Sequence, residues 1–463
     1  MRGPKRSDPG LAQLDAAELV KRTAGGQAKA EEVVRAHLDA ILAAEEKVQA
    51  WAHIDPEYAL DQARTLDRRR AAGLPLGPLH GVPVGVKDII DVRGLPCENG
   101  TVLDSGRRPG QDAAVVAKLR QAGAVVLGKT VTTELAVYHP GKTRNPHNPA
   151  HTPGGSSSGS AAAVAAGMVP LALGTQTNGS VIRPASFCGV VGYKPSRNLI
   201  SRRGILTQSP SLDAVGTFSR TIEDAALLAD AVAGYDPRDP AMHPTGRPSL
   251  YQLATGRPPV RPTIALVRSP VWNEADADTQ AAFAELAEVL GDAVDSIELP
   301  EPFGRAHSLH GAIMLADLAR NFSRYYDTGR DALSEKLRGM IEEGKRVLAV
   351  DYSLAQDWIE ILNAGLDSIF ERYDAIVTPA ASGEAPAGLE ATGSPAFSTI
   401  WTYCGVPALS LPLLTGSNGL PIGVQLVGRR GYDGRLLRTA RWLTETLLQG
   451  TETAAAQADG GRQ

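Results

Sequence analysis

Short apolar runs bounded by glycine and proline alternate with longer segments of helical periodicity along this 463-residue chain. Brief apolar runs between such breakers favour buried strands, whereas apolar residues that recur every three to four positions favour helices. The runs predict strands at 82–86, 124–130, 171–175, 263–267, 296–300, 374–380, 406–414 and 422–428. Helical periodicity is found at 12–72, 113–123, 160–167, 276–291, 307–371 and 436–448. This alternation predicts an α/β layered fold around a mixed sheet.

The composition excludes several classes of partner. Hydrophobic residues make up 43% and charged residues 21%, as is usual for a globular protein, and the net charge is −4. A nucleic acid or an anionic membrane needs a basic surface, so neither is expected as a partner. No apolar segment follows the basic N-terminus, and the most apolar stretch, 160–174, is short and contains Pro170. We therefore expect a soluble, cytoplasmic protein.

The cysteines indicate neither a disulfide framework nor a metal site. There are three of them, Cys97, Cys188 and Cys404, and they are widely separated, with no CxxC or Cys/His cluster. An odd and small number of isolated cysteines is typical of buried side chains in a reducing compartment.

Three segments contain residues suited to chemistry. GVPVGVKD places Lys87 at the end of a predicted strand, GGSSSGS at 154–160 opens a predicted helix, and GTQTNGSVIRP at 174–184 places Ser180 in the turn after another strand. Each has an ordinary interpretation when taken alone. A lysine beside an apolar run can extend its amine to solvent, a Gly/Ser run can be a loop or a helix start, and a serine after Asn-Gly is common in turns.

Taken together and in this order, the segments resemble those of the amidase-signature family. The family has an upstream lysine after a GxPxxxK pattern, a Gly/Ser-rich stretch, and a second serine 24 residues on, as Ser180 follows Ser156 here. FCGVVGYKPS at 187–196, GVPALSLP at 405–412 and GLPIGVQLVG at 419–428 also match. The resemblance covers 12–235 strongly and 372–448 moderately. It implies a large mixed sheet covered on both faces by helices.

The resemblance also implies a domain plan. We expect one catalytic domain over 1–448. Within it, 12–235 form the core that carries the signature, 236–371 form a variable, mainly helical region on the substrate side, and 372–448 return to the core sheet. The polar, alanine-rich residues 449–463 are expected to be a disordered tail.

The resemblance implies a role for each residue of a Ser–Ser–Lys triad. Ser180 would be the nucleophile, Ser156 a proton relay next to a cis peptide bond, and Lys87 the base. The oxyanion would be held by the backbone N–H groups of four turn residues, Thr177, Asn178, Gly179 and Ser180. Such a mechanism requires no metal and no cofactor.

The chemistry requires that Lys87 be uncharged. The usual pKa of a lysine is about 10.4, and burial away from carboxylates lowers it by disfavouring the ammonium form. The apolar segment before Lys87 suits that burial. Asp88 is adjacent, but neighbouring residues of an extended segment point to opposite faces, so its carboxylate is expected to point away.

The turn before Ser180 departs from the commonest family pattern, since Gln176 and Asn178 stand in TQTNGS where many members have a TDTGGS-like turn. TQTxGSVIRP is closer to malonamidase-type bacterial amidases, in which the equivalent arginine contacts a substrate carboxylate. Arg183 would then select an acidic half-amide; the alternative is a structural arginine that binds a carboxylate or carbonyl group behind the turn. Tyr138 and Gly155 are expected in the pocket wall.

The sequence thus predicts an amidohydrolase that cleaves C–N bonds of small or aryl amides, with carbamates (a urethanase activity) and esters also in range. The alternative is a glutamine-hydrolysing amidotransferase component that depends on partner subunits, although its usual DTGGS turn differs from the one here. An inactive binding protein on the same fold is disfavoured, because all three triad positions are intact. His307 and His310 are assigned no role, and homodimerisation is a family-level expectation.

Overall fold

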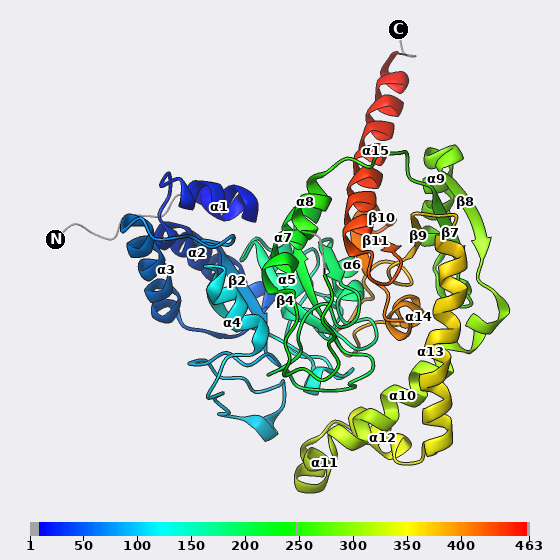
Figure 1. Cartoon of the computed structure of the whole chain (residues 1–463), viewed down its shortest axis with the longest axis horizontal. Coiled ribbons are helices and arrows are strands. Elements are labelled where there is room, and N and C mark those ends of the chain that lie inside the picture. The colour runs from blue at the N-terminus through cyan, green and yellow to red at the C-terminus, as the bar shows by residue number, and fades with distance from the viewer. Residues whose placement is uncertain (1–8, 247–248, 461–463) are drawn as a thin grey trace.

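One mixed sheet runs through the whole molecule in this computed structural model, which describes residues 9–246 and 249–460 (Figure 1). Within those residues eleven strands lie in the order β1-β3-β2-β4-β6-β5-β10-β11-β9-β7-β8. Their bounds are β1 (Trp51–Ile54), β2 (Pro83–Lys87), β3 (Val125–Thr130), β4 (Leu171–Gln176), β5 (Val191–Lys194), β6 (Ala214–Ser219), β7 (Ile264–Arg268), β8 (Val294–Glu298), β9 (Ala375–Pro379), β10 (Ala408–Thr415) and β11 (Pro421–Val427).

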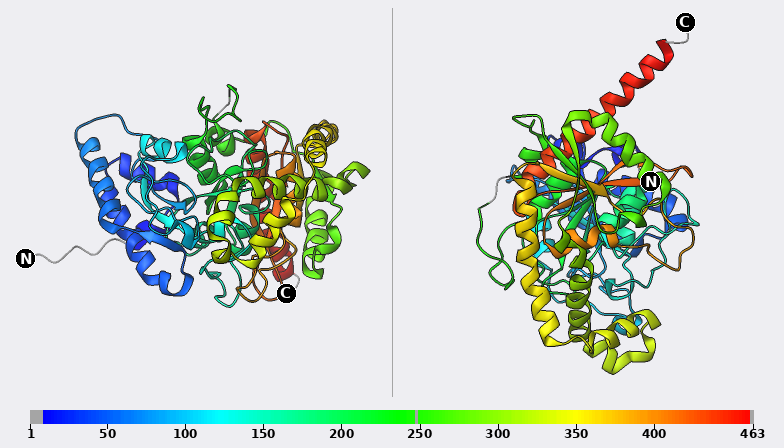
Figure 2. Two further views of the ribbon diagram at one scale, coloured as in Figure 1. Left: turned by 90° about the horizontal axis from the view of Figure 1, so that it is seen from below. Right: turned by 90° about the vertical axis from the view of Figure 1, so that its right-hand side faces the viewer.

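Helices connect and cover these strands. They are α1 (Ala16–Ala24), α2 (Ala30–Val48), α3 (Pro56–Ala71), α4 (Ala114–Gln121), α5 (Ser158–Ala165), α6 (Ile182–Cys188), α7 (Ile222–Val232), α8 (Leu250–Thr255), α9 (Ala277–Leu290), α10 (Ala306–Asn321), α11 (Ser323–Gly329), α12 (Glu335–Gly344), α13 (Ala349–Phe370), α14 (Ala396–Tyr403) and α15 (Asp433–Gly460). Short 3₁₀ helices occur between them. Helices α10 to α13 form an extension on one side of the sheet (Figure 2).

The central strands β3, β2 and β4 run parallel to one another. β2 pairs in parallel with both β3 and β4, and Val86 lies opposite Leu173. Because parallel strands end at the same edge, the last residues of β2 and β4 lie close together. β6 then pairs antiparallel with β4, which sets Ala214 opposite Gln176. The residue just before β6 is thereby brought beside the residue just after β4.

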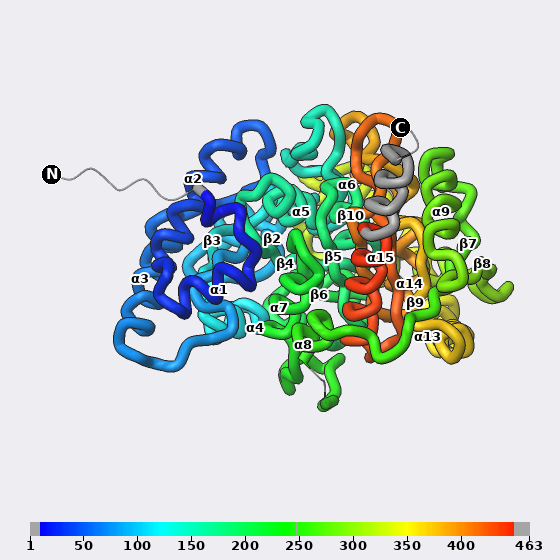
Figure 3. The backbone as a smooth tube through the Cα atoms, turned by 90° about the horizontal axis from the view of Figure 1, so that it is seen from above, coloured from blue at the N-terminus to red at the C-terminus, as the bar shows by residue number. Residues whose placement is uncertain are grey.

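Both faces of the sheet are buried, as the sequence predicts. In β3 and β4, Val126, Leu171 and Leu173 pack on the face covered by α1, α4 and α7. The alternate residues Val125 and Ala172 pack on the other face, with α2, α3 and α5. Towards the other end of the sheet α8, α9 and α15 continue the first layer, and α10, α13 and α14 continue the second. Seen from above, α1, α7, α8 and α15 lie in front of the sheet (Figure 3).

Most predicted elements are confirmed, and several were missed, α8 and α14 among them. The strands predicted at 82–86, 124–130 and 171–175 are β2, β3 and β4. The sequence did not predict β1, which lies within the segment interpreted as helices, nor the run α6, β5, β6 and α7. β1 shows a buried residue only at Trp51, so it lacks a strand-like apolar run. β5 and α6 are short, with 4 and 7 residues.

The last helix is longer than the helix expected at 436–448. α15 continues to Gly460, past residue 448 where the ordered domain was expected to end, and residues 461–463 of the predicted tail lie outside the described residues. The three cysteines are buried and free, as predicted. In the described part of the chain no helix is long and apolar enough to cross a membrane.

The packing of the sheet against its helices yields a stability prediction. Leu426 in β11 is 0% exposed, whereas Leu42 in α2 is 80% exposed. Leu426→Ala should lower the free energy of unfolding by about 2–5 kcal/mol, because it removes buried surface and leaves a cavity. The same change at Leu42 should alter it by less than about 0.5 kcal/mol. Urea unfolding measures both, and equal losses would contradict this account of the core.

Candidate active site

Lys87 and Ser156 meet at the carboxyl edge of the central strands. Lys87 ends β2 and is fully buried, and its Nζ lies 2.7 Å from Ser156 Oγ and 2.9 Å from Thr175 Oγ1. Ser156 precedes α5, and Thr175 lies near the end of β4. The parallel pairing of β2 with β4 brings the lysine beside Thr175. Thr175 was not among the residues that the sequence predicted for the site.

The surroundings of Lys87 favour its uncharged form. Burial holds the pKa of Lys87 well below its usual value, because the ammonium ion loses its hydration. The charge of Asp213 acts in the opposite direction and raises the same pKa. Asp88 points away from the site, as predicted, and forms a buried ion pair with Lys129 at 2.8 Å. The neighbouring carboxylate is thus engaged elsewhere.

Ser180 lies in the turn between β4 and α6 and is the least buried of the three predicted triad residues. The Gly155–Ser156 peptide bond is cis, as the resemblance implies. The backbone N–H of Ser157 donates to the carbonyl oxygen of Ser180 at 3.3 Å, and the Ser157 hydroxyl donates to the carbonyl of Thr175 at 3.1 Å. These bonds hold the start of α5 against the turn, so the segment of Ser156 and the segment of Ser180 lie side by side.

The buried side chain of Gln176 bonds to the helices on both sides of the turn. Its Oε1 accepts hydrogen bonds from the backbone N–H groups of Val181 at 2.7 Å and Ile182 at 3.0 Å, which lie at the start of α6. Its Nε2 donates to Thr402 Oγ1 of α14 at 2.9 Å. The amide of Gln176 thus accepts hydrogen bonds from α6 and donates one to α14, so it connects the turn to both helices.

The predicted oxyanion residues are held by side chains from distant parts of the chain. Asn178 donates from Nδ2 to the Tyr138 hydroxyl at 3.1 Å and accepts at Oδ1 from the Thr399 hydroxyl at 2.8 Å. Its carbonyl oxygen accepts from the Thr402 hydroxyl at 2.5 Å. Gly179 lies against α14, where a Cβ would come within 3.0 Å of Pro395. Tyr138 and the residues of α14 therefore hold the turn in place.

Thr177 is anchored by two residues that sequence reasoning missed. Its hydroxyl donates to Asp213 Oδ1 at 2.6 Å, and its carbonyl oxygen accepts from His310 Nε2 at 3.0 Å. His310 lies in α10, inside the region predicted to be variable, and is 1% exposed. Burial lowers the pKa of His310 to about 4, so the ring is neutral and donates from Nε2. No pattern in the sequence connects these residues; only the fold brings them together.

Arg183 is a buried cation with free hydrogen-bonding capacity. Its Nη2 donates to the carbonyl oxygen of Gly155 at 2.7 Å and to Thr392 Oγ1 at 3.1 Å. Its Nε and Nη1 are buried without a hydrogen-bond partner, and within the described residues it forms no ion pair. Burial lowers the pKa of Arg183 to about 10, although the nearby Tyr138 raises it. The carbonyl contact matches the structural interpretation of Arg183, and two of its nitrogens have unused hydrogen-bonding capacity.

Two further observations bear on what the site can hold. Across the described ranges no group of three or more His, Cys, Asp or Glu side chains could hold a metal ion. His307, the other histidine of α10, places Nε2 3.0 Å from the carbonyl oxygen of Ala396, next to the α14 segment that packs on the turn. The arrangement as a whole is a buried amine, two serines and a constrained turn with backbone N–H groups, which is suited to acyl transfer.

Comparison with known proteins finds chains similar to this one over most of its length. The family model described as Amidase matches residues 32–437. Among curated proteins, a glutamyl-tRNA(Gln) amidotransferase subunit from Salinispora arenicola (strain CNS-205) is 35% identical, and the alignment covers 93% of this chain and 96% of that protein. The protein of the same name from Symbiobacterium thermophilum (strain DSM 24528 / JCM 14929 / IAM 14863 / T) is 34% identical over 97% of this chain and 100% of its own.

Solved structures similar to this chain include a peptide amidase. The peptide amidase from Stenotrophomonas maltophilia is 30% identical, with a TM-score of 0.81, and the match covers 95% of this chain and 98% of that one. A chain from a vestigial protein complex, studied for the evolutionary origins of an s-triazine catabolic enzyme, has a TM-score of 0.87 at 28% identity over 94% and 98% of the two chains. The resemblance to malonamidase-type amidases stays a prediction, since these relatives carry other names.

The buried His310 predicts an acid-sensitive contribution to stability. Its pKa is about 4 in the folded chain against the usual 6.5, so between these pH values the unfolded chain binds more protons. Stability should therefore fall as the pH drops from 6.5 to about 4, by an amount of the order of 3 kcal/mol from this group.

His310→Gln should remove that part of the pH dependence, and urea unfolding at several pH values would show a shallower decline. His243 is exposed, and the same substitution there is the matched control. A His310→Gln variant as acid-sensitive as the wild type would contradict the assignment of a neutral, buried ring.

Proposed function

The chain belongs to the amidase family, and from this premise we propose that it hydrolyses an amide C–N bond through an acyl-enzyme on Ser180. The observation that carries the proposal is the direct contact of Ser156 with a buried lysine. Lys87 Nζ lies 2.7 Å from Ser156 Oγ, and burial holds the pKa of Lys87 well below its usual value. A neutral amine in that position can accept the proton that a serine hydroxyl must lose to become a nucleophile.

The proposed first half-reaction passes one proton along the three side chains. Lys87 takes a proton from Ser156 as Ser156 takes one from Ser180, and Ser180 Oγ bonds to the substrate carbonyl carbon. The backbone N–H groups of the turn from Thr177 to Ser180 stabilise the oxyanion. When the C–N bond breaks, Ser156 protonates the leaving nitrogen and is itself reprotonated by Lys87. The amine leaves, and the acyl group remains on Ser180.

Water completes the cycle by the same relay. A water molecule gives its proton to Ser156 while its oxygen bonds to the acyl carbon, and collapse of the intermediate returns a proton to Ser180 and releases the carboxylic acid. Each group ends in its starting protonation state. The same centre would act on esters, in which the leaving atom is oxygen, and on carbamates, in which the carbonyl carbon also carries an alkoxy group, because all three react by attack on a carbonyl carbon.

The free nitrogens of Arg183 favour substrates that carry a carboxylate in addition to the amide. A buried guanidinium without a counter-ion is costly, and a bound carboxylate would accept hydrogen bonds from Nε and Nη1, the two nitrogens without partners. A small amide with a nearby carboxylate, such as a malonamate-type half-amide, fits this requirement. Glutamine fits it as well, since it has both groups.

A partner-dependent glutaminase is the second candidate, and the curated relatives favour it over a free-standing amidase. Two of them, at 35% and 34% identity along nearly the whole chain, are named as amidotransferase subunits. Against it stands the turn sequence, TQTNGS rather than the usual DTGGS. The two candidates share the triad and the carboxylate preference, and they differ in whether the isolated chain turns over substrate. Glutamine hydrolysis that appears only on addition of partner subunits would favour the second.

The triad assignment predicts complete dependence of turnover on two residues. A panel consisting of a nitroanilide, a malonamate-type amide, a carbamate, an ester and glutamine should include at least one substrate of the wild-type chain. Lys87→Ala and Ser180→Ala should each lower kcat for that substrate by a factor of about 10⁴ or more, because base and nucleophile act as one unit. Steady-state kinetics measures this, and turnover that survives in Ser180→Ala would refute the assignment.

The role of Arg183 predicts a change in selectivity rather than a uniform loss. Arg183→Gln can still donate to the Gly155 carbonyl but has no charge. Its kcat/KM should fall about 30-fold to 1000-fold for a carboxylate-bearing amide, because a buried charge pair is lost. The value for a matched neutral amide should change much less. Equal losses on both amides would show that Arg183 only supports the turn.

A further inference from the structure

We propose that Asp213 is a positioning residue of this site, which stabilises the protonated form of Lys87 during the reaction and at the same time fixes the oxyanion turn through Thr177. The inference rests on the proposed function and deepens it. It adds a supporting side chain to the proton relay of Lys87, Ser156 and Ser180, the three residues that the sequence motifs indicate.

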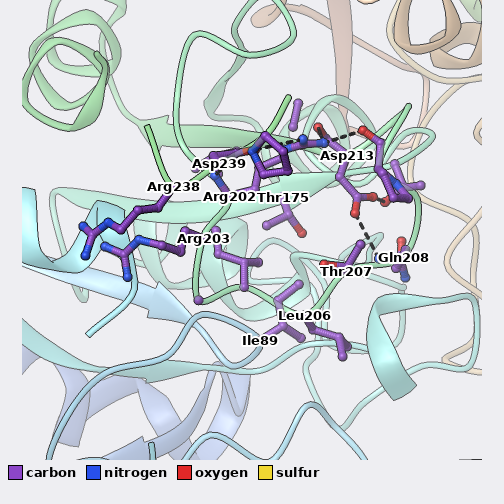
Figure 4. Close-up of a pocket in the computed structure, with 17 residues that line it drawn as sticks. Ile89, Thr175, Arg202, Arg203, Leu206, Thr207, Gln208, Asp213, Arg238 and Asp239 are labelled. Carbon is purple, nitrogen blue, oxygen red and sulfur yellow. Dashed lines mark hydrogen bonds and ion pairs between the residues drawn. The ribbon is translucent and has the colours of Figure 1, made fainter. Parts of the chain in front are cut away.

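Asp213 lines a cavity whose wall also contains Thr175, a hydrogen-bond partner of Lys87. The cavity has a volume of about 260 Å³, and its wall includes Thr175, Thr177 and Asp213, with apolar surface from Ile89 and Leu206 (Figure 4). Thr175 Oγ1 is one of the two hydroxyl oxygens in contact with Lys87 Nζ. Asp213 and Thr175, the hydrogen-bond partner of the lysine, therefore line the same cavity.

The carboxylate of Asp213 is held by neutral donors and has no ion-pair partner in the described part of the chain. Oδ1 accepts from the Thr177 hydroxyl at 2.6 Å, and Oδ2 accepts from the backbone N–H groups of Gln208 at 2.9 Å and Ser209 at 3.0 Å. Three hydrogen bonds hold its orientation without neutralising its charge. Its field is thus available to act on Lys87.

The charged groups around the cavity have other partners. Arg202 lowers the pKa of Asp213, but its guanidinium binds Asp239 and the carbonyl oxygen of Pro210. Arg203 and Arg238 both pair with Asp236, and they extend away from Asp213 (Figure 4). On the side of α10, Asp317 binds the Ser209 hydroxyl and His310 binds the Thr177 carbonyl. Arg202 Nη1 also donates to the backbone carbonyl oxygen of Asp213 at 3.4 Å, so it contacts this residue without pairing with its carboxylate.

The physical effect is a counter-charge for a buried cation. When Lys87 accepts the proton of Ser156, an ammonium ion forms where water cannot solvate it, and an anion nearby lowers the energy of that state. Burial raises the pKa of Asp213 to about 6, so the group is ionised at neutral pH and above. Asp213 raises the pKa of Lys87 while burial lowers it, so the two effects together set the working pH of the base.

The same carboxylate orients the turn. The antiparallel pairing that sets Ala214 opposite Gln176 puts Asp213 beside Thr177, the first residue of the turn. The bond to Asp213 fixes the Thr177 side chain while His310 fixes its carbonyl oxygen. Removing the carboxylate should therefore both loosen the turn and leave the Lys87 ammonium without its counter-charge.

The experiment measures the rate at which a serine-reactive fluorophosphonate labels Ser180 as a function of pH. This probe needs no knowledge of the substrate. The wild type, Asp213→Asn and Asp317→Asn are compared. Asp317 is a buried carboxylate bound to the same loop, but it lies outside the cavity wall, so its variant is the matched control.

In the Asp213→Asn variant the acid limb of the labelling rate should move to lower pH by about 1 unit, because the pKa of Lys87 falls when its counter-charge is removed. The maximal rate should fall at least about tenfold, because both the counter-charge and the fixed turn are lost. Asp317→Asn should leave the acid limb in place. Thr177→Val, which keeps the carboxylate but not its bond to the turn, should lower the rate without moving the limb.

An acid limb at the same pH in the wild type and in Asp213→Asn would overturn the proposal, as would an equal shift in Asp317→Asn. If Asp213→Asn does not fold, Asp213→Ser takes its place, because a hydroxyl can accept the N–H bonds without a charge. A wild-type chain that is not labelled at any pH would instead refute the proposed function itself. The two failures are therefore distinguishable.

Discussion

The burial of one lysine amine is the constraint on which the rest of the site depends. Lys87 has no exposed surface, and its Nζ contacts two hydroxyl oxygens, those of Ser156 and Thr175. An ammonium ion there would lack hydration, so the position favours a neutral base. The central place of β2 between two parallel strands provides that burial, and the pairing of Asp88 with Lys129 keeps the adjacent carboxylate away from the amine.

The turn after β4 depends on more of the chain than its sequence suggests. Gln176 ties it to α6 and α14, Asn178 to Tyr138 and α14, and Thr177 to Asp213 and to His310 of α10. The region 236–371 was expected to matter on the substrate side, yet through His310 it also supports the geometry of the turn. Variation in that region can therefore change the geometry of the turn.

Two buried ionisable groups without ion-pair partners lie on either side of this turn, within the residues described. Asp213 faces the cavity next to Thr175, and Arg183 contacts the carbonyl oxygen of Gly155. Relatives named as amidotransferase subunits match nearly the whole chain, and a solved peptide amidase shares its fold, so proteins of different names use one architecture.

The sequence by itself determined the α/β architecture and most strands and helices, because apolar periodicity is local. It also pointed to Lys87, Ser156 and Ser180, because each lies in a contiguous motif. It also placed Asp88 on the opposite face, because alternation along a strand is local too. Only the tertiary structure brought in Asp213, His310 and Thr402, which lie 36 to 224 residues from the turn residues they bind. Strand order decides such contacts: β6 lies beside β4, and α10 and α14 return to the turn from later in the chain. Single aspartates, histidines and threonines leave no local signal of what they will contact.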